Sequence, residues 1–173
     1  MSEWSVLAGV VMRADMMVDG ISFSRARVGG MDATHKLLAL YRTLDRSDIN
    51  VILLNGCVIS YYNVIDLHHL AEVIGLPLIC VTYKDSKGLE KSFRERFPED
   101  WQLRVEVYRR NGLRTCMMLH TGYVIYVRFL GMSKEEAVRV LNKFTLHGAV
   151  SEPLRVARLL ARSIMKKQVH QYG

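Results

Sequence analysis

The sequence has few cysteines, no long apolar run and no recognisable leader segment. Its three cysteines, Cys57, Cys80 and Cys116, are odd in number and widely spaced, so they match neither a disulfide framework nor a zinc site. No apolar run reaches the roughly 18 residues that a membrane span requires. The first residues, MSEWSVLAG, lack the order of a signal peptide. We therefore expect a cytoplasmic protein that does not contact a membrane.

The sequence also lacks the common catalytic motifs. It contains neither a Walker loop nor a GxGxxG phosphate-binding loop. His68 and His69 are adjacent and point to different faces of a helix, and the remaining histidines are isolated. This pattern argues against a histidine-ligated metal and against a cysteine–histidine nucleophile. Cys80 lies in an apolar run and is expected to be buried, whereas Cys57 follows a polar turn and could be a reactive thiol.

Length and composition indicate one globular domain over residues 1–173. Half of the residues are hydrophobic, which is ample for a core. The net charge of +7 is unevenly spread: residues 1–100 carry 11 Lys/Arg and 13 Asp/Glu, and residues 101–173 carry 13 and 4. A basic half favours an acidic partner such as nucleic acid. The alternative is a basic surface with no partner.

The most informative stretch is VILLNGCVISYYNVIDLHHLAEVIGLPLICV. Residues 51–54 form an apolar run that stops at Asn55. Residues 64–74 carry apolar side chains at helical spacing, and Gly75 ends that helix. Residues 78–82 then form the next apolar strand. Two apolar strands joined by a helix predict a parallel pair, with Asn55 at a carboxyl end facing a cleft where a ligand would bind.

The rest of the chain predicts a mixed sheet flanked by helices. Strands are expected over residues 6–12, 16–28, 103–108 and 123–129, with a hairpin or bulge at Asp19-Gly20. Helices are expected over residues 33–46, 86–97, 134–144 and from Pro153 onward, with a capping box at Ser133–Glu136. Hairpin strands followed by alternating helices and strands give an α/β fold, and a ribonuclease H-like topology has this order.

The candidate site residues are polar side chains near the predicted strand ends. They are Asp19, Asp32, Asn55, Asn63 and Asp66. Converging carboxylates can hold Mg²⁺ or Mn²⁺, and paired ions can clamp the oxygens of a phosphodiester. However, Asn55 offers no negative charge to a metal. Asp32 is equally explained as a helix cap, and Asp66 as a residue that stabilises the first turn of a helix.

The last helix carries a basic stripe. Its four members recur every three or four residues and share one helix face: Arg155, Arg158, Arg162 and Lys166. Such a stripe can follow a phosphate backbone. The alternative is a solvated face whose cations complement the helix dipole.

Several segments together resemble a known family. LAGVVMRADMMVDG, VGGMDAT, VILLNGCVISYYNVIDL, GLPLICV and SEPLRVARLLA resemble the mainly archaeal family catalogued as domain of unknown function ninety-nine. The match runs through nearly the whole chain in the right order. That family is regarded as similar to endonuclease V, which has a ribonuclease H-like fold and cuts nucleic acid near deaminated bases with Mg²⁺ or Mn²⁺.

The resemblance implies an altered metal site. Asp32 resembles the acidic ligand before the first helix. Asn55 stands in place of an aspartate, and Arg158 stands where the late helix usually offers His or Asp. Relatives also carry an N-terminal strand with an acidic ligand ahead of residues 7–13, and this first strand is apparently missing here. The gap in the sheet would be filled by shifted pairing or by a partner chain, so a homodimer is one expectation.

The favoured interpretation is an endonuclease V-like nucleic-acid-binding protein with a degraded metal site, which binds Mg²⁺ or Mn²⁺ weakly at best. One alternative is an active metal-dependent endonuclease on deaminated DNA or RNA. Another is a non-enzymatic protein-interaction module. Because the net positive charge lies in residues 101–173, we expect binding to depend on the basic C-terminal part rather than on the strand-end cleft.

Overall fold

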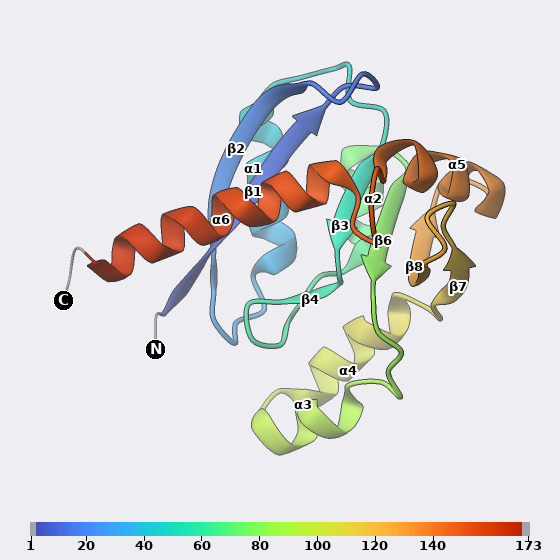
Figure 1. The fold of residues 1–173 in the computed structure, drawn as a ribbon. Helices are drawn as coiled ribbons and strands as arrows, with labels where there is room; N and C mark the ends of the chain where they lie inside the picture. The colour runs from blue at the N-terminus through green and yellow to red at the C-terminus, as the bar shows by residue number, and fades with distance from the viewer. Residues whose placement is uncertain (1–2, 171–173) are drawn as a thin grey trace.

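The computed structural model describes residues 3–170, which form a mixed α/β fold (Figure 1). The strands are β1 (Trp4–Met12), β2 (Val18–Arg27), β3 (Ile52–Asn55), β4 (Val58–Ile59), β5 (Asn63–Val64), β6 (Leu78–Thr82), β7 (Thr115–Met118) and β8 (Val124–Leu130). The helices are α1 (Ala33–Leu44), α2 (Leu67–Ile74), α3 (Glu90–Arg96), α4 (Trp101–Arg110), α5 (Lys134–Phe144) and α6 (Glu152–His170). None of these helices is both long and apolar enough to cross a membrane.

The central sheet has the order β3-β6-β8-β7. β3 and β6 are parallel, with Asn55 opposite Val81, which confirms the predicted strand pair. β8 pairs antiparallel with both β6 and β7. Since β3 and β6 run in the same direction, Asn55 and Thr82 end at the same edge of the sheet.

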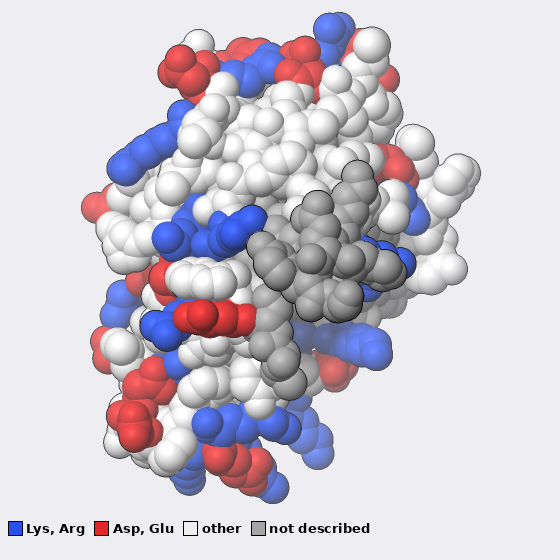
Figure 2. Space-filling model, turned by 90° about the vertical axis from the view of Figure 1, so that its left-hand side faces the viewer, with Lys and Arg blue, Asp and Glu red and all other residues white. Residues whose placement is uncertain are grey.

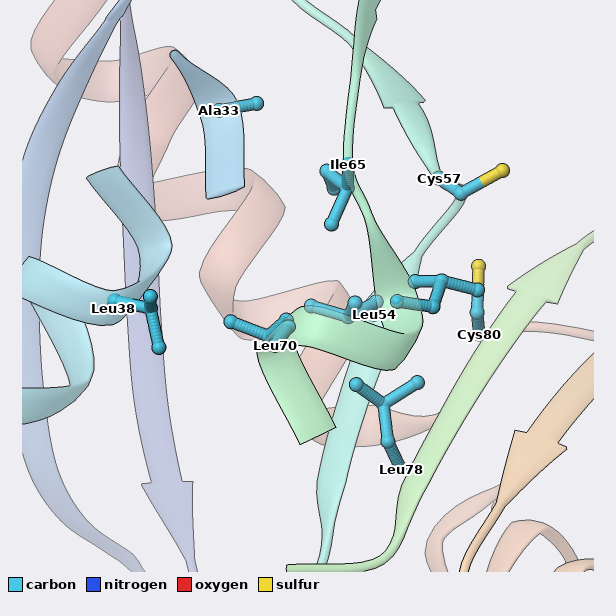
Figure 3. Close-up of a cluster of buried hydrophobic side chains, with 9 residues drawn as sticks. Ala33, Leu38, Leu54, Cys57, Ile65, Leu70, Leu78 and Cys80 are labelled. Carbon is cyan, nitrogen blue, oxygen red and sulfur yellow. The ribbon is translucent and has the colours of Figure 1, made fainter. Parts of the chain in front are cut away.

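Both faces of the central sheet are covered, and successive side chains of β6 pack on opposite faces. Leu78 and Cys80 join a cluster with α1 and α2 (Figure 3), whereas Ile79 and Val81 join a second cluster with α5. Every residue from 78 to 81 is at most 2% exposed. This burial explains why the strand reads as an unbroken apolar run.

The β1–β2 hairpin forms a separate two-stranded sheet, with Trp4 opposite Arg27. Of the hairpin or bulge expected at Asp19-Gly20, the structure contains the bulge: the register with β1 shifts there, since Val11 pairs with Gly20 and Met12 with Val18. The chain reverses earlier, where Met16 adopts a left-handed φ of 68° and the backbone N–H of Arg13 donates to the carbonyl of Met17. Asp15 stabilises this turn by accepting from the backbone N–H of Met17.

The start of α2 also differs from the prediction, whereas its end does not. The helix expected from residue 64 begins at Leu67, because Val64 pairs with Val58 in the β4–β5 hairpin. Asp66 caps this helix by accepting a hydrogen bond from the backbone N–H of His69, so it stabilises the first turn, as one reading of the sequence predicted. Gly75 ends the helix with a φ of 73°, as its position predicted.

The strand predicted over residues 103–108 was wrong, because these residues lie in α4. Apolar and polar residues alternate over 103–108, which is typical of a strand, but their burial does not follow this alternation. Leu103 is 50% exposed, whereas Arg104 is 2% exposed and is held by Asp100 one turn away over 2.7 Å. A buried, paired arginine therefore takes a core position that the pattern assigned to apolar side chains.

Candidate functional site

A cleft opens at the carboxyl ends of β3 and β6, where the strand order predicted it. Its volume is about 560 Å³. Asn55 and Cys57 line it from the end of β3, and Thr82 and Tyr83 from the end of β6. Its four cationic lining residues come from distant parts of the chain: Lys84, Arg114, Arg128 and Arg158. No carboxylate is among the lining residues that the structure describes.

Arg114 is fixed in place by the segment that follows β6. Its Nη1 donates to the carbonyl of Lys84 over 2.9 Å, and its Nη2 donates to the carbonyl of Ser86 over 2.8 Å. Its guanidinium also lies 5.0 Å from the ring centroid of Tyr126. Only 14% of the side chain is exposed, so this cation is held rigidly against the cleft wall.

Arg128 lies deeper, in the middle of β8, and is 7% exposed. Its Nε donates to the carbonyl of Gly112 over 2.8 Å, and its Nη1 lies 3.5 Å from Cys57 Sγ. A hydrogen bond from the buried Cys80 and the charge of Arg128 together lower the pKa of Cys57 to about 7, against the opposing effect of burial. The sulfur atoms of the two cysteines lie on the same side of the core cluster (Figure 3).

Arg158 approaches the cleft from α6 and, like Lys84, is an exposed cation. Its side chain is exposed, and it makes no ion pair or hydrogen bond with any other residue that the structure describes. Below it, burial raises the pKa of Tyr83 to about 12, which Arg158 and Arg155 partly oppose. The Tyr83 hydroxyl has no hydrogen-bond partner among the described residues. The exposed guanidinium of Arg158 is therefore available to an external anion.

The predicted basic stripe on α6 is exposed throughout, but its members differ in surroundings. Arg155 is engaged locally: its Nη2 donates to the carbonyls of His147 and Val150, and its Nε lies 3.3 Å from Glu152. Arg162 and Lys166 lie one and two turns beyond Arg158, about 6 and 12 Å along the helix axis. Of the four, only Arg158 lines the cleft.

Asp32, the principal carboxylate expected at the site, does not line the cleft. It precedes α1, but its side chain makes no capping bond to that helix. Instead it accepts from the backbone N–H of Arg27 over 3.2 Å and from Asn63 Nδ2 over 2.7 Å. The expected side-chain cap was therefore wrong, because Asn63, which is fully buried, accepts from the N–H of Ala33 in its place.

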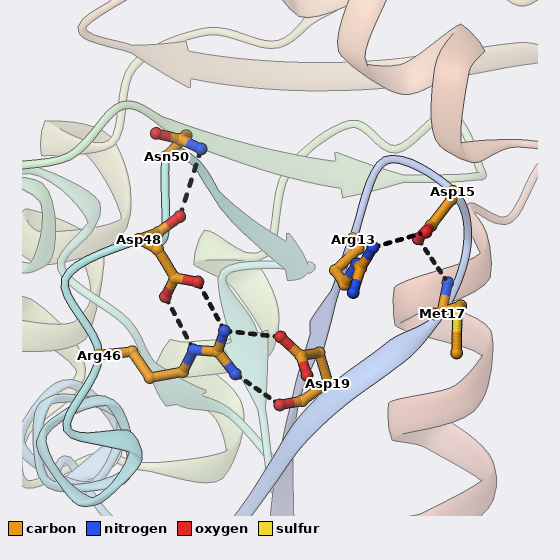
Figure 4. Close-up of polar contacts among 7 residues, drawn as sticks. All are labelled: Arg13, Asp15, Met17, Asp19, Arg46, Asp48 and Asn50. Carbon is orange, nitrogen blue, oxygen red and sulfur yellow. Dashed lines mark hydrogen bonds and ion pairs between the residues drawn. The ribbon is translucent and has the colours of Figure 1, made fainter.

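Asp66 and Asp19 are also engaged elsewhere. Asp66 pairs with Arg110 over 2.8 Å. Asp19 accepts from Arg46 over 2.6 Å, and Arg46 also binds Asp48 (Figure 4). Asp19 is near the start of β2, whereas Asp32 contacts the end of that strand, about 25 Å further along at the rise of an extended chain.

The structure therefore does not bring the predicted metal ligands together. Within residues 3–170, no group of three or more His, Cys, Asp or Glu side chains lies close enough to hold a metal ion. Hard divalent cations require several oxygen ligands, and the cleft at Asn55 offers cations instead. The residues present do not fit a divalent metal site in this cleft.

The sequence argument missed three of the four cleft cations. Lys84 lies two residues beyond the carboxyl end of the strand over residues 78–82, and this position was a usable signal. Arg128 interrupts an otherwise apolar strand, which marks a buried and specifically paired charge. Arg114 offered no such signal, because its place depends on the tertiary contacts of the segment after β6.

A family model described as "Endonuclease dU" matches residues 1–165. The chain belongs to this family. A "UPF0215 protein" of Pyrobaculum calidifontis is 37% identical over 161 residues, which are 93% of this chain and 88% of the relative. A second one, from Pyrobaculum aerophilum, is 34% identical over 159 residues, which are 91% and 84%. The resemblance to an archaeal family is thus confirmed.

Solved structures show the same fold. A protein of unknown function from Archaeoglobus fulgidus has a TM-score of 0.78 and 24% identity, and the match covers 92% of this chain and 89% of that one. Ciona intestinalis endonuclease V, in complex with DNA containing an inosine, has a TM-score of 0.61 and 15% identity, with 95% and 80% covered. This member of the Endonuclease dU family therefore shares the endonuclease V-like fold.

Proposed function

We propose that this Endonuclease dU family member binds nucleic acid through the cleft at the carboxyl ends of β3 and β6. The observation that carries the proposal is the convergence of Lys84, Arg114, Arg128 and Arg158 on a cleft without carboxylates. Arg128 sets a fixed positive charge, Arg114 is held in place and ion-paired with Asp85 over 3.4 Å, and Arg158 is exposed for direct contact. A phosphate backbone is the polyanion that such a cleft fits, because each neutralised phosphate releases counterions.

The C-terminal basic part and the cleft are one surface in this proposal. Arg114, Arg128 and Arg158 all belong to residues 101–173, which hold the net positive charge. The face that carries the β2 strand and the end of α6 is different: charges of both signs are intermingled over its lower half (Figure 2). Mixed charges attract a polyanion less strongly than a cleft lined by one sign.

The substrate class is inferred from the comparisons. The family description names dU, which we take to be deoxyuridine, and the Ciona intestinalis endonuclease V structures contain DNA with an inosine. Uracil and inosine are both products of base deamination. We therefore infer that the preferred ligand is a strand carrying a deaminated base, with its backbone lying along the cleft cations.

The proposal includes a degraded metal site. Asn55 supplies a neutral amide where a carboxylate would attract a cation, and Arg128 and Arg158 would repel one. Asp32 is committed to Asn63 and to the backbone of Arg27. These contacts support weak binding of Mg²⁺ or Mn²⁺ and a binding role rather than strand cleavage.

A second candidate is an active endonuclease, which the family description favours. The two are separated by incubating the protein with uracil-containing and matched thymine-containing DNA in the presence of Mn²⁺. The binding proposal expects salt-dependent association without strand cleavage. Cleavage that requires uracil and Mn²⁺ would establish the enzyme instead. Absence of any salt-dependent binding to DNA or RNA would favour the protein-interaction alternative.

A further inference from the structure

Two cysteines lie side by side at the base of the cleft. Cys80 is in the middle of β6 and pairs with Leu54 of β3 in the register of the two strands. The chain reaches Cys57 three residues after Leu54, and it turns at Gly56, which has a φ of 83°. A glycine suits this turn because it has no side chain to clash in the left-handed region. The turn brings the thiol of Cys57 back to that of Cys80.

The two thiols are in hydrogen-bond contact. Cys80 donates to Cys57 Sγ, and the backbone N–H of Gly56 donates to Cys80 Sγ. Both sulfur atoms lie on the same side of the core cluster that the two residues share (Figure 3). Each is a free thiol in this structure. Two facing thiols on fixed backbone are the arrangement from which a disulfide can form.

The two thiols differ in access and in acidity. Cys57 lines the cleft, whereas Cys80 is 1% exposed and lies behind it. The hydrogen bond from Cys80 and the charge of Arg128 lower the pKa of Cys57 to about 7, and Arg128 Nη1 lies 3.5 Å from Cys57 Sγ. The hydrogen bond to Cys57 and burial raise the pKa of Cys80. Cys57 is therefore suited to attack as a thiolate, and Cys80 is suited to react second as a thiol.

The other groups packed against Cys57 are donors and cations. Arg128 of β8 is held by the carbonyl of Gly112 over 2.8 Å and lies 5.3 Å from the ring centroid of Tyr108 in α4. The side chain of Asn111, at the end of α4, also donates to Cys57. The remaining charged groups of the cleft are its other three cations, and no lining residue that the structure describes is a carboxylate. These surroundings stabilise a thiolate at Cys57 and offer nothing that repels it.

We propose that Cys57 and Cys80 form a redox modification site, at which a hydroperoxide such as hydrogen peroxide joins them in a disulfide. Cys57 takes the oxidant from the cleft, and Cys80 supplies the second thiol from the core. A hydrogen peroxide molecule is hardly larger than water, so it can reach Cys57 Sγ through the cleft, which has a volume of about 560 Å³. The product is a covalent link between the turn after β3 and the middle of β6.

The reaction balances in two steps. The thiolate of Cys57 attacks one oxygen of the peroxide: an S–O bond forms, the O–O bond breaks, and hydroxide leaves and takes up a proton to become water. The sulfur of Cys80 then attacks the sulfenic acid of Cys57: the S–S bond forms, the S–O bond breaks, and the hydroxyl group leaves with the proton of Cys80 as a second water. The two sulfur atoms are oxidised by one electron each, and the peroxide is reduced to two waters.

The disulfide also changes the charge at the cleft. At pH 8 the reduced protein carries the Cys57 thiolate beside Arg128, so the two charges oppose each other. The disulfide is neutral, and oxidation therefore leaves the charge of Arg128 uncompensated. This consequence rests on the proposed nucleic-acid function of the cleft. The oxidised protein is expected to bind a phosphate backbone more tightly, because the net positive charge that faces it is greater.

The test begins with the chemistry and uses the Cys116→Ser protein, which lacks the one exposed cysteine. The protein is treated with a small excess of hydrogen peroxide, and its intact mass and its digest are measured. We expect a loss of two hydrogen atoms, protection of both thiols from alkylation, and a pair of peptides linked through Cys57 and Cys80. Dithiothreitol should reverse all three changes.

Single variants in the same background assign the two roles. With Cys80→Ser, the sulfenic acid at Cys57 has no partner and should be trapped by dimedone. With Cys57→Ser, the remaining thiol is buried and protonated, so its oxidation should be at least about tenfold slower than that of Cys57. Equal oxidation rates of the two variants would overturn the assignment of Cys57 as the attacking thiol.

The second measurement is the affinity of the Cys116→Ser protein for uracil-containing DNA at pH 8 and low salt, before and after oxidation. The disulfide should raise affinity at least about threefold, and peroxide should leave the affinity of the protein that also carries Cys57→Ser unchanged. Absence of the link between Cys57 and Cys80 would overturn the modification site. A disulfide that leaves DNA affinity unchanged would overturn its effect on the cleft. A disulfide in a protein that binds no nucleic acid would support the modification site and contradict the proposed function instead.

Discussion

Asn63 donates a hydrogen bond of 2.7 Å from its Nδ2 to Asp32 Oδ1, and this contact fixes the carboxylate at the entry to α1. The same amide donates to the carbonyl of Arg27 and accepts from the N–H of Ala33, each over 3.0 Å. Asn63 is fully buried, so it joins the end of β2, the start of α1 and the β4–β5 hairpin. The carboxylate most expected to hold a metal thus has a structural role.

Asn63→Ala is expected to destabilise the protein by about 2–3 kcal/mol, because it leaves the buried N–H of Ala33 without its partner and removes the hydrogen bonds to Asp32 and to the carbonyl of Arg27. Chemical denaturation measures this as a lower midpoint with an unchanged slope. Asn50→Ala, at an exposed position, serves as the control and should change stability by less than about 0.5 kcal/mol. Equal effects of the two changes would contradict the structural role of Asn63.

Binding of Mg²⁺ is expected to be weak and independent of Asn55. The cleft around Asn55 is lined by four cations and no carboxylate, and Asp32 is engaged with Asn63. Isothermal titration of the protein with Mg²⁺ should therefore give the same weak response for wild type and Asn55→Ala. Micromolar affinity for Mg²⁺, or its loss on replacing Asn55, would show that the cleft holds a metal.

One thiol is expected to ionise near neutral pH. The pKa of Cys57 lies at about 7, below its ordinary value of 9.0, so the thiolate should form as the pH rises through 7. Ultraviolet absorbance of the thiolate, followed against pH, measures this step. Cys80→Ser should leave a titrating thiol at position 57, whereas Cys57→Ser should remove the step. A single step near pH 9 in the wild type would disprove the lowered pKa.

The sequence predicted those parts of the fold whose patterns are local. The parallel pair β3 and β6, the capping box at Ser133–Glu136 and the left-handed Gly75 all follow from periodicity or cap chemistry, and the structure contains them. It failed at residues 103–108, where Arg104 is buried because its guanidinium donates to the carbonyls of Gly29, Gly30 and Tyr62, far away in the sequence. Local pattern does not reveal which charge will find a partner across the fold.

The site was predictable in place but not in composition. The carboxyl end of β3 follows from the strand order, and Arg158 follows from the helical stripe. Two facts depend on long-range packing: Arg158 meets Asn55 in one cleft, and Asp19 lies at the far end of the hairpin with Arg46. The helical spacing did not distinguish Arg155 from Arg158. In the structure Arg155 donates to the carbonyls of His147 and Val150, whereas Arg158 lines the cleft.

The most direct measurement is the salt dependence of binding to fluorescent uracil-containing DNA, compared between wild type, Arg158→Gln and Arg25→Gln. Arg25 is exposed on β2, away from the cleft, and its replacement removes the same charge. We predict that Arg158→Gln weakens binding at every salt concentration and reduces the slope of log affinity against log salt by about one, whereas Arg25→Gln leaves both unchanged. Equal effects of the two changes, or none from Arg158→Gln, would contradict a nucleic-acid site in the cleft.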